Sequence, residues 1–126
     1  MIETMKRNNF ISFFIIVCTL TICSCTSDDG FERYVIKDVT LPCNIILSAS
    51  DTTIIPSSIS IYITGVVNGN CVFEVENGCG RYKTIRLKDT IDYCYMNEWY
   101  NHQINIRYIP DTRITGDSIM IKYQIW

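Results

Sequence analysis

Residues 118–126 read SIMIKYQIW, and this stretch decides the fold. Its apolar side chains Ile119, Ile121, Tyr123 and Ile125 fall on every second position, which is the period of a β-strand with one buried face. The same alternation appears in three further stretches, at residues 58–66, 71–76 and 103–109. The sequence therefore predicts a sheet protein in which each strand turns one apolar face inward.

The composition agrees with this pattern. From Cys25 onward the chain contains 17 Ile and 6 Val but only 3 Leu and 1 Ala. Branched side chains lose rotamer freedom in a helix and pack well on a pleated sheet. We expect almost no helix.

Turn signals divide the chain into strands. The Asn-Gly pairs at 68–69 and 77–78 supply the left-handed backbone that a tight hairpin needs, so each predicts a turn between paired strands. The strands at 103–109 and 118–126 are expected to pair as a long hairpin. Residues 89–102 follow neither strand nor helix period and are expected to form an irregular loop rich in aromatic side chains.

Seven short strands are expected in all, at residues 31–41, 43–49, 58–66, 71–76, 81–87, 103–109 and 118–126. Short strands separated by turn signals are typical of an all-β fold. They predict a small antiparallel β-sandwich of immunoglobulin-like or transthyretin-like architecture. A small β-barrel is the alternative.

The first part of the chain has the features of an export signal. Lys6 and Arg7 precede an uncharged apolar run at 10–22, which is shorter than the helix of about 20 residues that a bilayer requires. The hydrophobic region of a signal peptide has this length. Met5, directly before the basic pair, is an alternative start to Met1.

Residues 22–25 (ICSC) close this run and resemble the lipobox of bacterial lipoproteins. The resemblance implies cleavage before Cys25, a diacylglycerol on its thiol and a further acyl chain such as palmitate on its new amino group. Several acyl chains together make a stable membrane anchor. The predicted organisation is a signal peptide at 1–24, a lipidated cysteine and tether at 25–32, and a β-sandwich domain at 33–126. An ordinary secretory peptide is the alternative.

Two further resemblances concern location. Residues 26–30 (TSDDG) resemble the acidic export signal of surface-displayed lipoproteins in Bacteroidetes-type bacteria, which implies a surface-exposed outer-membrane lipoprotein, with the periplasmic face as alternative. Asp-Ser and Asp-Thr triplets resemble the O-glycosylation sites of the same bacteria, although such pairs also begin ordinary turns. The candidate acceptors are Thr52, Thr90 and Ser118.

Charge and cysteine content narrow the function. The region from Cys25 has 9 Lys+Arg against 12 Asp+Glu, a net charge of −3 without a basic cluster, so we expect no nucleic-acid partner. Four cysteines in an exported domain predict two disulfides, with zinc binding as an alternative that the absent C-x-x-C spacing disfavours. The preferred bonds are Cys43–Cys71 and Cys79–Cys94.

The inventory of catalytic groups is thin. His102 is the one histidine, no G-x-S-x-G motif accompanies it, and no carboxylate pair stands in an apolar run. We expect no catalytic residue, no cofactor and no metal site. Aromatic rings flanked by the amides of Asn97 and Asn101 suit a sugar ring or a partner's side chain, although Trp99 could instead plug one end of the sandwich. The candidate binding residues are Tyr93, Tyr95, Trp99, Tyr100 and His102.

These features predict a lipid-anchored protein of the cell envelope that is not an enzyme and serves as a binding or accessory module for a protein or a glycan. Two alternatives remain open. One is an inhibitor or immunity-type lipoprotein that blocks an incoming protein. The other is a structural subunit of a surface assembly, in which an edge strand such as residues 118–126 pairs with a neighbour.

Overall fold

The computed structural model describes residues 30–126, and residues 31–126 form one compact unit. The predicted signal peptide, Cys25 and most of the predicted tether lie outside the described residues. Within residues 30–126, no helix is long and apolar enough to span a membrane.

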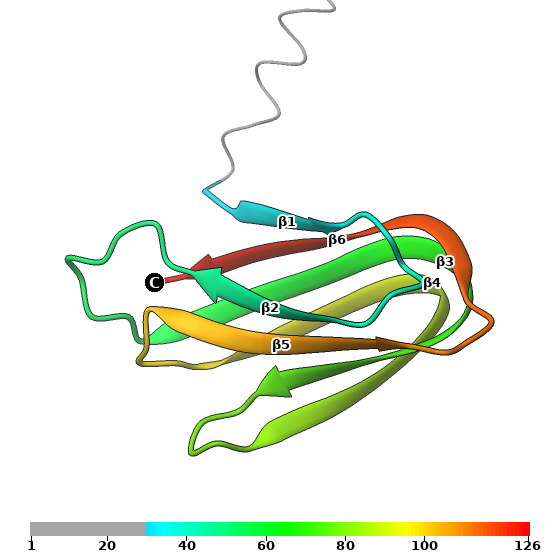
Figure 1. Ribbon diagram of the computed structural model, residues 1–126. Helices are drawn as coiled ribbons and strands as arrows, with labels where there is room; N and C mark the ends of the chain where they lie inside the picture. Colours follow the sequence, from blue (N-terminus) through cyan, green and yellow to red (C-terminus); the bar gives the residue numbers. More distant parts are fainter. Residues whose placement is uncertain (1–29) are drawn as a thin grey trace, which may run out of the picture. The chain divides into compact units, whose positions relative to one another are not determined.

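Six antiparallel strands build the unit, so the predicted small antiparallel β-sandwich is confirmed, although with one strand fewer than expected. The strands, labelled in Figure 1, are β1 (Glu32–Ile36), β2 (Cys43–Ser48), β3 (Ser58–Glu76), β4 (Tyr82–Glu98), β5 (Gln103–Pro110) and β6 (Thr115–Ile125).

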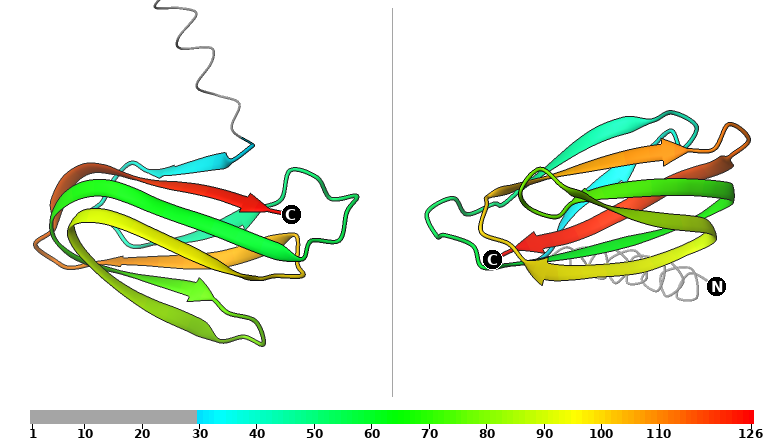
Figure 2. Two further views of the ribbon diagram at one scale, coloured as in Figure 1. Left: turned by 180° about the vertical axis from the view of Figure 1, so that it is seen from behind. Right: turned by 90° about the horizontal axis from the view of Figure 1, so that it is seen from below.

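The long hairpin of β3 and β4 belongs to both layers of the sandwich. Residues 58–66 of β3 pair with β6 and with the second half of β4, and β6 also pairs with β1. Residues 70–76 of β3 pair with β5 and with the first half of β4, and β5 also pairs with β2. We call these two groups the first layer and the second layer. Figures 1 and 2 show the hairpin curling from one to the other.

The Asn-Gly pair at 68–69 is the bend in β3, and the prediction of a tight hairpin there is wrong. The register of the β3–β4 pairing shifts between Val66 and Asn70. Gly69 adopts a φ of +128° and its N–H donates to Asp89 Oδ1 at 3.3 Å, while Asp89 itself has a φ of +58°. A bulge and a hairpin turn both need left-handed backbone, so the same residue pair serves either.

Three more predictions about the strands are corrected. Residues 89–98 continue β4 rather than forming an irregular loop. The strands β5 and β6 do not pair with each other, because each pairs with a different half of β3. The first strand also ends at Ile36 instead of residue 41, where Asp38 Oδ1 accepts hydrogen bonds from Thr40 N (3.0 Å) and Thr40 Oγ1 (2.5 Å) in a turn.

The core lies between the layers and is built from the inward positions that the alternation predicts. Phe73 and Tyr108 are fully buried, with ring centroids 5.1 Å apart, and the Tyr108 hydroxyl donates to the Val39 carbonyl at 2.6 Å. Around them lie buried branched side chains from four strands: Ile45, Ile59, Ile61, Ile63, Val75, Ile104, Ile106, Ile119 and Ile121.

The four described cysteines are free thiols, so the predicted disulfides are wrong. Cys43 lies on β2 and Cys71 on β3, with β5 between them. Two strand spacings amount to about 10 Å, whereas bridged Cα atoms lie at most about 7 Å apart. Cys94 faces outward opposite Tyr62, and Cys79 lies in the turn after β3.

Two buried tyrosines make the fold sensitive to alkaline pH. Burial, together with the hydrogen bond to Glu32 and its charge, raises the pKa of Tyr123 to about 12, and burial also raises the pKa of Tyr108. An unfolded tyrosine ionises near pH 10. The unfolded chain therefore loses these protons first, and stability that is present below pH 10 is lost as the pH rises to 12.

We expect the free energy of unfolding in urea to fall with a shallower slope in Tyr123→Phe than in the natural protein over this pH range. Equal slopes for the two proteins would contradict the expectation. Because the chain has 8 tyrosines, the titration of Tyr123 is followed as the difference in tyrosinate absorbance between the natural protein and Tyr123→Phe.

Candidate functional site

A groove of about 510 Å³ lies at the end of the sandwich where β3 runs into the β3–β4 turn and β4 runs into the β4–β5 loop. This volume lies in the range of about 300–1,000 Å³ that is typical of ligand sites. One wall comes from the turn between β3 and β4, and the other from the end of β4 and the β4–β5 loop. The lining residues are Glu76, Asn77, Gly78, Cys79, Asn97, Glu98, Trp99, Tyr100 and Asn101.

The turn at 77–81 gives the first wall its shape. Asn77 N donates to the Arg81 carbonyl at 2.8 Å, and Arg81 N donates to the Gly78 carbonyl at 3.1 Å. Between them Gly78, Cys79 and Gly80 all have positive φ, from +55° to +77°. This five-residue turn is wider than the two-residue turn expected for the Asn-Gly pair at 77–78, and it brings Asn77 over the end of the first layer.

Amide groups join the two walls. Asn77 Oδ1 accepts hydrogen bonds from Asn97 Nδ2 at 2.9 Å and from the Tyr95 hydroxyl at 3.2 Å. Asn97 Nδ2 also donates to the Tyr95 hydroxyl at 3.1 Å, and Asn97 Oδ1 accepts from Glu98 N at 2.9 Å. These bonds between the protein's own groups fix the shape of the groove, which lowers the ordering cost of binding.

The groove is polar and carries negative charge. Glu76 Oε2 accepts two hydrogen bonds of 2.9 Å from the backbone and side chain of Asn105, so this carboxylate is held in place. Glu98 Oε2 accepts from the Tyr100 hydroxyl at 3.1 Å, and this bond with the charge of Glu98 raises the pKa of Tyr100. The lining residues include no lysine or arginine, so the groove favours a neutral or cationic ligand over an anionic one.

The predicted binding residues divide between core and surface. Tyr95 and Trp99 are buried, at 5% and 6% exposure, and Trp99 Nε1 donates to the Gln103 carbonyl at 3.1 Å, so Trp99 plugs this end of the sandwich. Tyr93 is half-buried on the same inward face of β4. Tyr100 is 67% exposed and presents its ring at the rim of the groove.

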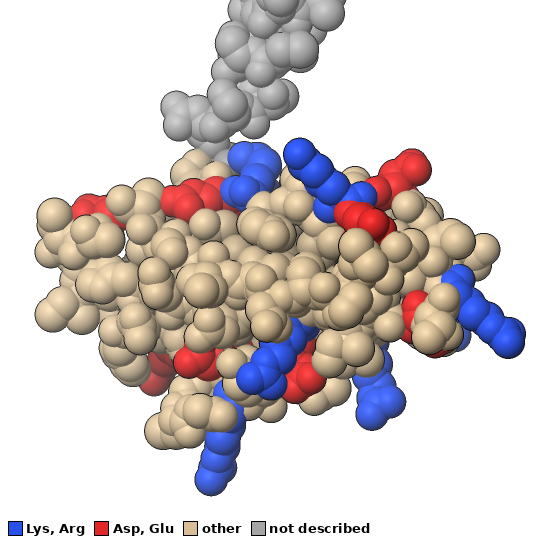
Figure 3. Space-filling model, viewed as in Figure 1, with Lys and Arg blue, Asp and Glu red and all other residues tan. Residues whose placement is uncertain are grey.

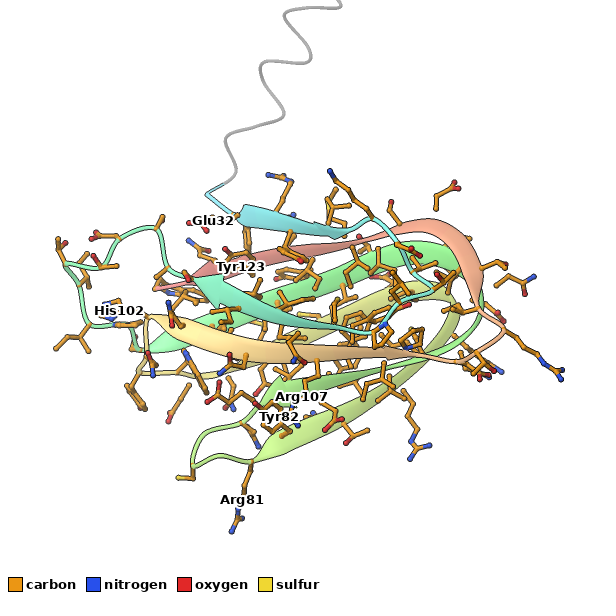
Figure 4. All side chains as sticks on the ribbon, in the orientation of Figure 1. Glu32, Arg81, Tyr82, His102, Arg107 and Tyr123 are labelled. Atoms are coloured by element: carbon orange, nitrogen blue, oxygen red, sulfur yellow. The ribbon has the colours of Figure 1, made fainter. Side chains whose placement is uncertain are left out.

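His102, labelled in Figure 4, lies apart from the groove lining. Its Nε2 is 2.8 Å from the Ile54 carbonyl oxygen, which ties the β4–β5 loop to the loop before β3. Asp51 belongs to the same loop as Ile54, and its pKa is lowered by hydrogen bonds from Thr53 and, to a smaller extent, by the charge of His102. This position gives His102 a structural role between two loops.

Sequence reasoning missed the first wall of the groove. Asn97 and Asn101 were expected beside the aromatic residues, but Glu76 and Asn77 come from a turn some 20 residues earlier. The Asn-Gly pair marked the turn without indicating which part of the sheet it would approach.

The other candidate positions are spread over the surface. Thr52, Thr90 and Ser118 are all exposed, and their glycosylation stays a prediction. Residues 30–126 contain no group of three or more His, Cys, Asp or Glu side chains that could hold a metal ion.

The chain resembles two solved structures at low identity. One is the crystal structure of PirA, at 15% identity and a TM-score of 0.40, with 79% of this chain and 96% of that chain covered. The other is a CBM4 structure, at 10% identity and a TM-score of 0.41, with 78% of this chain and 72% of that chain covered. No protein-family model matches, and no curated protein matches. Likenesses this distant carry no argument about the ligand.

Proposed function

We propose that this protein is a non-enzymatic binding module of the bacterial cell envelope, anchored through acyl chains on Cys25, whose groove binds a neutral glycan. The lipobox-like residues 22–25 and the acidic stretch 26–30 support the anchor and a position on the outer-membrane surface. The groove supports the binding role.

One observation carries the choice of ligand: the exposed ring of Tyr100 stands beside amides and carboxylates that are fixed by hydrogen bonds. A sugar ring stacks its C–H face on an aromatic ring, and its hydroxyl groups both donate and accept hydrogen bonds. Asn77 and Asn101 have amide groups at the lining, and Glu76 and Glu98 supply acceptors. The two carboxylates disfavour sulfated or carboxylated sugars.

Tyr100→Ala should test the groove without disturbing the core, because 67% of the Tyr100 side chain is exposed. We expect the variant to lose at least about tenfold in affinity for the neutral oligosaccharides that the natural protein binds, a change that corresponds to about 1.4 kcal/mol. Binding to a panel of neutral and acidic oligosaccharides is measured by calorimetry or on an array.

Two further variants serve as controls. Tyr100→Phe keeps the ring and should retain most of the affinity. Tyr34→Ala removes a tyrosine that is 38% exposed on β1, at the opposite edge of the first layer, and should bind as the natural protein does. Capture of an envelope protein that is unaffected by Tyr100→Ala, without glycan binding, would instead support the inhibitor or assembly alternative.

A further inference from the structure

Large apolar side chains stand in water at the end of the unit where the chain passes from β2 to β3. Ile54 is 62% exposed, Ile55 is 81% exposed and Trp126 is 48% exposed. We call these three residues the apolar tip. In Figure 3 the left end of the unit, where the loop between β2 and β3 lies in Figure 1, is almost free of charged side chains. Exposed apolar groups that gather in one place mark an interaction surface.

Hydrogen bonds fix the apolar tip to the sandwich. The Trp126 carbonyl accepts hydrogen bonds of 2.8 Å from both Ser57 N and Ser58 N. The Ile54 carbonyl lies 2.8 Å from His102 Nε2, and Asp51 Oδ1 accepts from Thr53 N at 2.9 Å. These bonds hold the two isoleucines outward in a defined loop.

The apolar tip lies near the place where the chain enters the sandwich. The Tyr123 hydroxyl donates to Glu32 Oε2 at 2.6 Å and lies 3.3 Å from the Ser48 carbonyl. Glu32 begins β1 and Ser48 ends β2, directly before the loop that carries the isoleucines. Figure 4 shows Glu32 and Tyr123 together at this side.

The chain between Cys25 and Phe31 consists of only five residues. Even fully extended, six residue steps span about 20 Å. If Cys25 carries the acyl chains, as proposed above, the side of the sandwich where β1 begins must stay within that distance of the lipid headgroups.

We infer that the apolar tip inserts into the headgroup region of the bilayer to which Cys25 is anchored. This inference rests on the proposed lipid anchor. Tryptophan is favoured at a membrane interface, and the transfer of an isoleucine side chain out of water lowers the free energy. The three side chains of the tip carry no charge, and the neighbouring Asp51 is acidic, so contact with zwitterionic lipid should be at least as good as with anionic lipid.

The groove lies at the same end of the unit as the apolar tip, because Trp99 N donates to the Ser57 carbonyl at 3.1 Å and His102 Nε2 lies 2.8 Å from the Ile54 carbonyl. In the first layer, β6 and β3 lie between β1 and β4, so the groove beside the end of β4 is at the far edge from β1. At this end of the sandwich the groove is therefore displaced toward the β4 edge, away from the edge where the chain enters β1.

The test uses the full lipoprotein reconstituted into phosphatidylcholine vesicles that contain brominated lipids, which quench tryptophan fluorescence at the membrane. The chain has two tryptophans, and Trp99 is buried. We expect quenching in the natural protein, and its loss in Trp126→Phe. The double variant Ile54→Asp, Ile55→Asp should keep the protein on the vesicles but reduce the quenching by at least half.

Val66→Asp is the matched control, because Val66 is 71% exposed at the bend of β3, at the other end of the unit, and should leave quenching unchanged. Protein that floats with the vesicles but shows no quenching, or equal quenching in the double variant, overturns the inference and leaves the anchor intact. Protein that does not float with the vesicles overturns the anchor and the inference together.

Discussion

Trp99→Ala is expected to lower the free energy of unfolding by about 3–5 kcal/mol, as large-to-small substitutions of buried aromatic residues do. Trp99 is 6% exposed, and its Nε1–H is satisfied by the Gln103 carbonyl. Alanine would leave a cavity between the layers and an unpaired carbonyl at the start of β5. The measurement is urea unfolding followed by circular dichroism.

The neighbouring Tyr100→Ala is the control for this experiment. Its ring is mostly in water and its one described hydrogen bond is to the exposed Glu98, so the loss should stay within about 0.5 kcal/mol. A loss for Trp99→Ala no greater than that for Tyr100→Ala would show that Trp99 does not support the end of the sandwich.

Phe73→Ala should destabilise the protein to a similar extent, about 3–5 kcal/mol. Phe73 is fully buried and its ring lies 5.1 Å from that of Tyr108, so truncation leaves Tyr108 without its main aromatic neighbour. For a unit of this size the melting temperature should fall by more than about 12 °C, which calorimetry can measure.

Val72→Ala gives the comparison on the next position of the same strand. Val72 points to the outer face of the second layer and is only half-buried, so its truncation should cost less than about 1 kcal/mol. Similar losses for Val72→Ala and Phe73→Ala would contradict the assignment of the two faces of β3.

The buried faces of the strands could be predicted because alternation is a local signal. Ile59, Ile61 and Ile63 are buried as expected, and so are Ile104, Ile106 and Tyr108, with at most 1% exposure. Strand pairing could not be predicted in this way, since no local pattern in β5 or β6 indicates that the two strands pair with different halves of β3. The prediction that β5 and β6 pair as a hairpin is wrong for that reason.

The second half of β4 could not be recognised as a strand from its sequence. Tyr93 and Tyr95 point inward, but Cys94 and Met96, which point outward, are also apolar, so no polar and apolar alternation marks this half of the strand. The disulfide prediction rested on the compartment and the even number of cysteines. Neither the compartment nor the number of cysteines indicates the strand order, which places β5 between Cys43 and Cys71.

Only one wall of the groove could be predicted from the sequence, because sequence patterns do not show how distant parts of the chain pack. Tyr100 and Asn101 stand in one aromatic stretch that could be recognised, whereas Asn77 reaches the groove only through the packing of one layer on the other. Burial then separates Trp99 from Tyr100, although both are large aromatic residues next to each other in the chain.

The hairpin that runs through both layers has a consequence for folding. Because β3 contributes backbone partners to β4, β5 and β6, neither layer can melt while the other stays native. Amide hydrogens in residues 58–66 and 70–76 should exchange with solvent at one common slow rate, set by global opening. Formation of this hairpin would come early, since β3 and β4 are adjacent in sequence, and the later docking of β1 and β2 would complete the edges.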